Sequence, residues 1–134
     1  MRIMIALLTL TLLSGAKSPF AGTWEGKING LPGIDLTIED AGGKISGVVG
    51  FYFQLRGDDG KWRVADKYTV PLLAPRVEGR TLEFEMIHHK RHGSDELGPN
   101  AKFRLELSGA DEASLRKLED RPDGGPGLKL IRTR

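Results

Sequence analysis

The sequence contains no cysteine and no long hydrophobic run, and its charge has no dominant sign. Without cysteine the chain forms no disulfide, so its stability has to come from packing and backbone hydrogen bonds. Its 134 residues suffice for one domain with a single core. The 20 Lys and Arg residues are interleaved with 18 Asp and Glu residues. The chain therefore lacks the basic patch that is typical of nucleic-acid-binding proteins.

The longest apolar segment, residues 3–13, lies at the N-terminus directly after Arg2. A membrane-spanning helix needs about 20 apolar residues, so this segment is too short to anchor the chain. Together with the small residues Ser14 and Ala16, it is typical of a cleaved secretory signal peptide. We therefore predict a signal peptide at residues 1–16 and a single mature domain at residues 17–134, exported to the periplasm or secreted. No membrane span and no lipid anchor are expected in the mature chain.

From Phe20 onward, apolar residues recur at every second position, which is the spacing of a strand with one buried face. Residues 44–56 form the longest such segment, and the cluster at residues 57–60 is the strongest hairpin turn. Pro71 and Pro75 interrupt residues 68–77, which predicts an edge-like or irregular strand there. A further turn is expected over Asn29, Gly30, Pro32 and Gly33.

About eight antiparallel strands with short turns predict an all-β fold, an up-and-down β-barrel whose interior just holds side chains or one small ligand. Two packed sheets are the alternative, because both folds have the same period of two.

The first strand begins with Gly22, Thr23 and Trp24 shortly after the predicted leader. This stretch resembles the glycine-x-tryptophan signature of lipocalins and of the wider calycin group, and the chain as a whole is similar to small exported bacterial lipocalin-like proteins. The resemblance implies that Trp24 closes one end of a barrel beneath a basic residue of the last strand. Arg132 is the first choice for that residue and Arg134 the second. The chain departs from lipocalins in its shorter length and in lacking a C-terminal helix and the threonine-aspartate-tyrosine loop motif.

The bulkiest side chains on the inward positions are candidates for contact with a ligand. A pocket for a small molecule is mostly apolar with a few placed polar groups, and a histidine that continues an inward row of apolar residues fits that description. The candidate ligand-binding residues are Trp24, Phe51, Phe53, Phe84, Met86, His88 and Phe103. The same side chains could instead fill the interior and leave no cavity.

No motif for catalysis, metal or cofactor binding is present. His88 and His89 point to opposite faces if the strand continues, and Lys90 and Arg91 would repel a cation. Ser94, His92 and Asp95 are chain neighbours in a loop, which is not how a catalytic triad is arranged. We therefore expect no metal, no cofactor and no enzyme activity.

Two functions remain open from the sequence. The first is a non-enzymatic lipocalin-like barrel that binds a small hydrophobic ligand. The second is a protein-interaction or inhibitor-type barrel with a filled core. The sequence does not indicate the oligomeric state.

Overall fold

The computed structural model describes residues 18–87, 96–118 and 127–134, and these residues form strands and turns without a helix. The predicted signal peptide, His88, and the other histidines lie outside the described residues. The described residues form nine strands, whereas the sequence predicts about eight. They are β1 (Gly22–Ile28), β2 (Leu31–Ala41), β3 (Lys44–Arg56), β4 (Trp62–Pro71), β5 (Leu73–Glu78), β6 (Thr81–Met86), β7 (Ala101–Leu107), β8 (Glu112–Lys117) and β9 (Leu128–Arg132).

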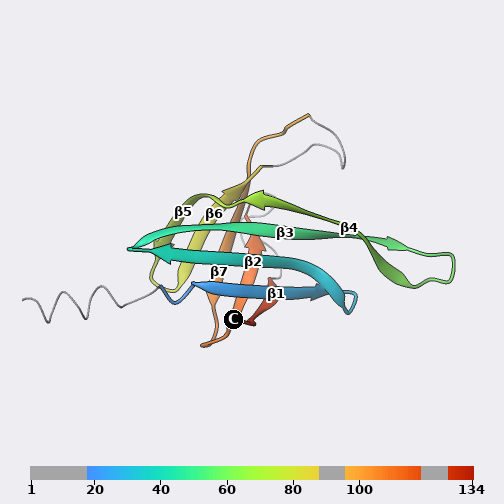
Figure 1. Ribbon diagram of the computed structural model, residues 1–134, viewed down its shortest axis with the longest axis horizontal. Helices are drawn as coiled ribbons and strands as arrows, with labels where there is room; N and C mark the ends of the chain where they lie inside the picture. Colours follow the sequence, from blue (N-terminus) through green and yellow to red (C-terminus); the bar gives the residue numbers. More distant parts are fainter. Residues whose placement is uncertain (1–17, 88–95, 119–126) are drawn as a thin grey trace, which may run out of the picture.

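All nine strands belong to one antiparallel sheet in the order β4-β3-β2-β1-β9-β8-β7-β6-β5. The first and last strands pair in its middle, through Trp24 with Arg132 and Glu25 with Ile131. The sheet curls, so that β1, β2 and β3 cross the direction of the later strands (Figure 1). The alternative of two separate sheets is therefore wrong for the described strands.

The two edge strands, β4 and β5, follow each other in the chain. Leu72 separates them, and its amide donates a hydrogen bond of 3.0 Å to the carbonyl of Gly47 in β3. Beyond Leu72 the chain leaves β3 and pairs with β6 instead. The segment predicted as one irregular strand from Pro71 and Pro75 is thus split into β4, which pairs with β3, and β5, which pairs with β6. This split accounts for the ninth strand.

The turn between β1 and β2 is shorter than the sequence predicts. Asn29 and Gly30 both have positive φ values, 57° and 74°, which is the backbone of a tight two-residue hairpin turn. Pro32 and Gly33, which were expected to belong to the turn, lie inside β2. A bulge between Gly26 and Lys27 adjusts the pairing beside them. The turn at Asn29 and Gly30 therefore reverses the chain by itself, although Pro32 and Gly33 form a second turn signal in the sequence.

The core lies on the concave face of the curled sheet and draws side chains from every strand except β5. The inward positions expected in β2, β6 and β7 are correct, because residues at alternating positions there are buried. The largest fully buried side chains are Trp24, Phe20, Phe84, Leu36, Leu82, Met86, Leu105, Leu130 and Val49. No helix among the described residues is long and apolar enough to cross a membrane.

The hairpin of β3 and β4 extends beyond the ends of β1 and β2 (Figure 1). Pairing between β2 and β3 begins at Ile34 and Phe51, so β3 pairs with β4 alone past that point in the described strands. We call residues 52–67 the β3–β4 arm. Leu55, expected to face the interior, is half exposed in this arm, and Phe53 is not part of the core cluster. Both miss the core because the other strands end before they reach them.

Candidate functional site

Trp24 closes one end of the concave face. It is fully buried in β1, and its indole Nε1–H donates a hydrogen bond of 2.9 Å to the carbonyl of Phe20. Phe20 is also fully buried, so the segment before β1 folds over this end of the sheet. Because the only polar atom of the Trp24 side chain has a partner, the ring is buried without an unsatisfied donor.

Arg132, the first choice from the sequence, lies over Trp24. Its Cζ atom is 4.4 Å from the centroid of the Trp24 ring, as expected for a cation–π contact. Its side chain also donates hydrogen bonds to the carbonyls of Pro19, Ala21 and Ala110 and to the carboxylate of Asp111. One guanidinium therefore joins the N-terminal segment, the β7–β8 turn and the last strand. We call this end, with Trp24 and Arg132, the closed end.

Gly22 provides the close approach that this arrangement requires. Its φ is +130°, and a Cβ atom there would lie 2.3 Å from the carbonyl oxygen of Arg134 and 3.2 Å from Cδ of Arg132. The amide of the next residue, Thr23, donates to the same Arg134 carbonyl at 2.9 Å. Only glycine leaves room for the C-terminal backbone at this point.

The opposite end of the sheet, which we call the open end, carries the β1–β2 turn and the β3–β4 arm. In an up-and-down sheet, alternate connections lie at the same end. The chain therefore also leaves β6 and β8 at this end, whereas the short β2–β3, β5–β6 and β7–β8 turns lie at the closed end.

Aromatic side chains line the concave face toward the open end. Phe51 stacks on Tyr68 across the β3–β4 pair with centroids 5.5 Å apart, and Phe84 stacks on Phe103 across the β6–β7 pair at 5.9 Å. Phe84 is almost fully buried, but Phe51 and Phe103 are partly exposed at the border of the core cluster. An aromatic surface is thus present on both sides of the concave face.

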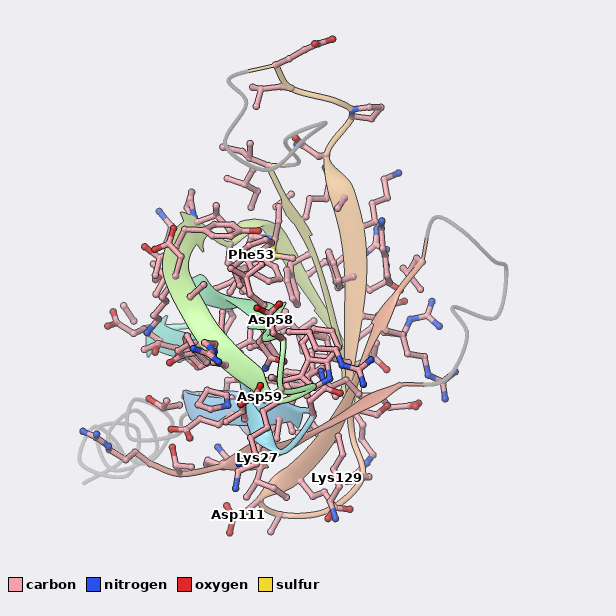
Figure 2. All side chains as sticks on the ribbon, turned by 90° about the vertical axis from the view of Figure 1, so that its right-hand side faces the viewer. Lys27, Phe53, Asp58, Asp59, Asp111 and Lys129 are labelled. Carbon is pink, nitrogen blue, oxygen red and sulfur yellow. The ribbon has the colours of Figure 1, made fainter. Side chains whose placement is uncertain are left out.

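The remaining candidate ligand-binding residues differ in their positions. Met86 is buried at the end of β6, and Phe53 lies in the β3–β4 arm, one inward position beyond Phe51 (Figure 2). Along β3 the inward side chains change from buried Val49 through partly exposed Phe51 and Phe53 to exposed Leu55. His88 lies outside the described residues. The structure thus places Phe53 at the rim and Trp24 at the far, closed end.

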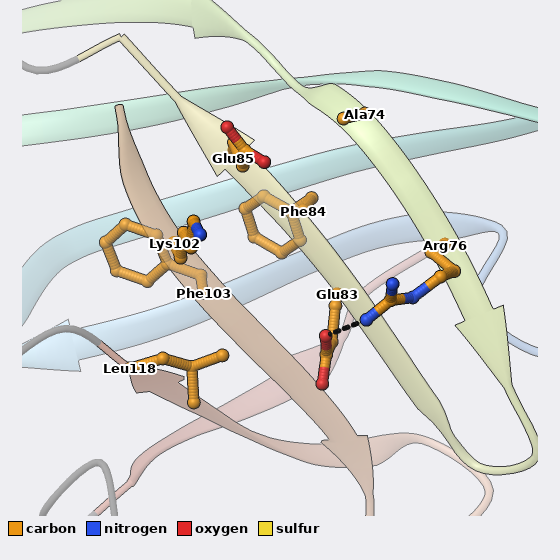
Figure 3. Close-up of a pocket in the computed structure, with 8 residues that line it drawn as sticks. All are labelled: Ala74, Arg76, Glu83, Phe84, Glu85, Lys102, Phe103 and Leu118. Carbon is orange, nitrogen blue, oxygen red and sulfur yellow. Dashed lines mark hydrogen bonds and ion pairs between the residues drawn. The ribbon is translucent and has the colours of Figure 1, made fainter. Parts of the chain in front are cut away.

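A hollow of about 240 Å³ lies over β5, β6 and β7 (Figure 3). It is lined by Ala74, Arg76, Glu83, Phe84, Glu85, Lys102, Phe103 and Leu118. Half of these residues are charged, which does not suit an apolar ligand. Glu83 accepts from Arg76 at 2.6 Å and from Nη2 of Arg104 at 2.8 Å, and these hydrogen bonds, chiefly that from Arg104, lower the pKa of its carboxyl. Glu83 is therefore held in ion pairs with two arginines.

A second polar cluster lies on the convex face, where β2, β3 and β4 run side by side. The hydroxyl of Tyr52 donates to the carboxylate of Asp35 at 2.8 Å, and the Lys67 ammonium lies 3.2 Å from the same oxygen. Tyr52 and then Asp35 raise the pKa of Lys67. Gly50 leaves the space for this cluster, because a Cβ atom there would lie 2.4 Å from Asp35. No sequence motif marks this cluster, since its members are 17 and 15 positions apart in the chain.

The described residues include no group of three or more His, Asp or Glu side chains arranged to hold a metal ion. Glu83 and Glu85 lie on the convex side of β6, as their alternation with buried Leu82, Phe84 and Met86 requires. Glu83 pairs with arginine, and Glu85 accepts from Asn100 at 3.4 Å. We therefore take the concave face near the open end as the candidate site.

Comparison of the chain with protein-family models, with curated proteins and with solved structures finds no significant match. The resemblance to lipocalin-like proteins therefore rests on Gly22, Trp24 and Arg132 and on the strand pattern.

Proposed function

We propose that this protein is an exported, non-enzymatic lipocalin-like barrel that binds a small apolar molecule on the concave face near the open end. The strand order supports the fold. If β4 and β5 are counted as one bent strand, the chain follows the order of an eight-stranded up-and-down barrel, with β1 beside β9 and the bend held by Leu72 and Gly47. The contact of Arg132 with Trp24 is of the kind expected for a calycin-type closed end.

One observation carries the proposal: several aromatic side chains of the concave face keep part of their surface exposed. Trp24 and Phe84 are buried, whereas Phe51, Phe53 and Phe103 keep exposed surface. Aromatic surface left open to water on a concave face is favourable for an apolar molecule, since burial contributes roughly 25 cal/mol per Å². Ligand sites of this kind are concave and mostly apolar.

The test is a fluorescence titration of the delipidated protein with N-phenyl-1-naphthylamine, an apolar probe that brightens when it leaves water. We expect saturable binding by the wild type. Phe51→Ala and Phe53→Ala should each weaken binding about tenfold, which corresponds to about 1.4 kcal/mol of lost contact. Val48→Ala is the matched control, because Val48 lies on the same strand but faces outward and is 45% exposed. Its affinity should be unchanged.

A protein-interaction barrel with a filled core is the second candidate. The dense group of fully buried side chains on the concave face favours it, because these side chains occupy much of the interior. Absence of saturable probe binding, together with native mass spectra that show no retained lipid, would decide for this second function.

A further inference from the structure

The outer edge of β4 is unpaired in the described part of the chain. β4 is the last strand on its side of the sheet and pairs with β3 alone, and each of its residues except Val70 is exposed. An edge strand presents amides and carbonyls to which a further strand can pair. The other edge strand, β5, is shorter and contains Pro75, which has no amide to donate. The edge suited to a further strand is therefore that of β4.

The β3–β4 arm, which carries most of this edge, is held in place at its base. The side chain of Gln54 donates to the carbonyls of Ile28 at 2.9 Å and Pro32 at 3.0 Å, and it accepts from Asn29 at 3.0 Å. The polar cluster on the convex face adds contacts among β2, β3 and β4. Because the arm extends past β1 and β2 (Figure 1), its edge is open to a second chain. A strand fixed in this way loses little conformational freedom on pairing.

A bulge in β4 places residues of opposite charge on one face. The pairing with β3 skips Ala65. Because of this extra residue, Arg63 and Asp66 both lie on the concave side, although they are three positions apart. For the same reason Trp62 and Lys67 both lie on the convex side. Each of the two pairs is arranged symmetrically about the bulge.

This order of side chains is complementary to itself. When two copies of β4 are placed antiparallel about a two-fold axis at the bulge, Arg63 of each copy lies opposite Asp66 of the other, and Trp62 lies opposite Lys67. Directly opposite residues of an antiparallel pair share a face, and this register meets that condition on both faces. The two-fold axis repeats each contact, so the pairing forms two ion pairs and two contacts of lysine with tryptophan.

Other registers of the same two strands fit less well. A shift by one residue sets concave side chains opposite convex ones, which does not match the pleat. The nearest register that matches the faces again places Arg63 opposite Tyr68 and Val64 opposite Lys67, without an ion pair. Charges and bulges usually protect an edge strand from pairing. In β4 they instead favour a single register with a second copy.

The arm is long enough for two copies to pair side by side. β2 begins to pair with β3 at Phe51, which lies opposite Tyr68 in β4. In the favoured register Tyr68 lies opposite Lys61 of the second copy, beside the turn at the tip of its arm. The three-stranded part of each copy therefore begins only where the other arm ends. The overlap from Trp62 to Lys67 has about the length of an average strand.

We propose that this protein self-associates as a two-fold dimer in which the outer edges of β4 from two copies pair antiparallel, with Arg63 of each copy against Asp66 of the other. In the single chain, Asp66 accepts from the amide of Lys67 at 2.8 Å, and Arg63 lies 3.9 Å from Asp59. Both contacts are local and exposed, so the dimer replaces them at little cost. The inference goes beyond the proposed function, because this pairing requires no ligand.

The experiment is sedimentation velocity of the protein, expressed with its full sequence, over a range of protein concentrations. We expect a monomer–dimer equilibrium that salt weakens. Arg63→Asp and Asp66→Arg should each weaken association at least about tenfold, because each sets like charges opposite each other twice. An equimolar mixture of the two variants should associate again, since one copy then carries two aspartates and the other two arginines at these positions. Lys27→Asp, the same charge change at an exposed site of β1, should associate like the wild type.

Trp62 provides a second measurement, because its ring is 42% exposed in the single chain and becomes covered in the dimer. Its emission should shift to shorter wavelength as the dimer forms, whereas Trp24 is fully buried throughout. The Trp62→Phe variant should lack the shift, and circular dichroism shows whether each variant is folded.

A wild type that stays monomeric would overturn the inference and leave the edge to a strand of another protein. A dimer that both charge variants leave intact would overturn it too, because its interface would then lie elsewhere. The same holds for a mixture of folded variants that does not associate, and for a wild-type dimer whose Trp62 emission does not shift.

Discussion

The guanidinium of Arg132 lies 4.4 Å from the ring centroid of Trp24, and the two residues also face each other in the pairing of β9 with β1. The contact joins the first and last strands of the chain. The same arginine donates hydrogen bonds to carbonyls of the N-terminal segment and of the β7–β8 turn. Its loss would therefore loosen both segments together. The stability of the closed end is therefore concentrated in a single pair of side chains.

Trp24→Ala should lower the free energy of unfolding by about 3–5 kcal/mol, as large-to-small changes of buried aromatic residues do. The substitution removes a fully buried ring and leaves the Phe20 carbonyl without its indole donor. Urea denaturation followed by circular dichroism measures the change. Trp62→Ala, at an exposed site, should change it by less than about 0.5 kcal/mol, and equal effects of the two substitutions would contradict the closed-end arrangement.

Arg132→Lys should destabilise the protein nearly as much as Arg132→Met, by about 2 kcal/mol in each case, because hydrogen bonds from a charged donor contribute about 1.5–3 kcal/mol. Lysine keeps the charge but cannot reach Pro19, Ala21 and Ala110 at once, since it lacks the planar fork of arginine. The midpoint of urea denaturation reports the difference. Full rescue by lysine would show that charge over the ring, rather than the set of hydrogen bonds, is what matters.

Gly22→Ala should lower the stability by more than about 2 kcal/mol, because the new methyl group would overlap the Arg134 carbonyl as well as strain the backbone. Gly30→Ala is the matched control: Gly30 also has a positive φ, but a Cβ atom there meets nothing within 4 Å. It should show only the strain of a left-handed residue, about 1–2 kcal/mol. Thermal unfolding of both variants measures the difference, and a Gly22→Ala variant no less stable than Gly30→Ala would refute the close approach.

The ion pairs of Glu83 should make stability depend on pH in the acidic range. Arg104 first, and then Arg76, lower the pKa of Glu83 from its ordinary value of 4.5. The stabilisation is therefore fully present above pH 4.5 and is lost as the pH falls through the lower pKa of the folded state. The difference in unfolding free energy between wild type and Glu83→Gln should shrink over this window. The effect should be small because the two arginine side chains are largely exposed to water, and a difference that grows on acidification would contradict the sign.

Much of the secondary structure follows from local patterns. The span of residues 44–56 predicted as one strand is the observed β3, and the alternation of Leu82, Phe84 and Met86 correctly identifies their buried face. Period-two spacing is read from neighbours in the chain, so it needs no knowledge of the rest of the fold. The placement of Arg132 over Trp24 was expected from the resemblance to calycins, and the structure has this contact.

The candidate site was predicted less completely. The sequence placed Phe51, Phe53 and Leu55 on one face, but the same alternation occurs whether a strand lies inside the sheet or extends past it. Exposure along β3 depends on where its pairing with β2 stops, at the pair of Ile34 and Phe51. The Asp35, Tyr52 and Lys67 cluster was missed for a related reason, since it forms only when three strands align in register.

By itself, the sequence determined where most of the strands lie, which face of β2, β6 and β7 is apolar, and that no disulfide stabilises the fold, because these properties depend on residue type and on spacing along the chain. The tertiary structure decided what Arg132 bonds to, where β4 becomes β5, and that residues 52–67 extend beyond the sheet as the β3–β4 arm. Backbone carbonyls carry no sequence signal, and the reach of one strand past another depends on register. Such relationships exist only after distant segments have packed together.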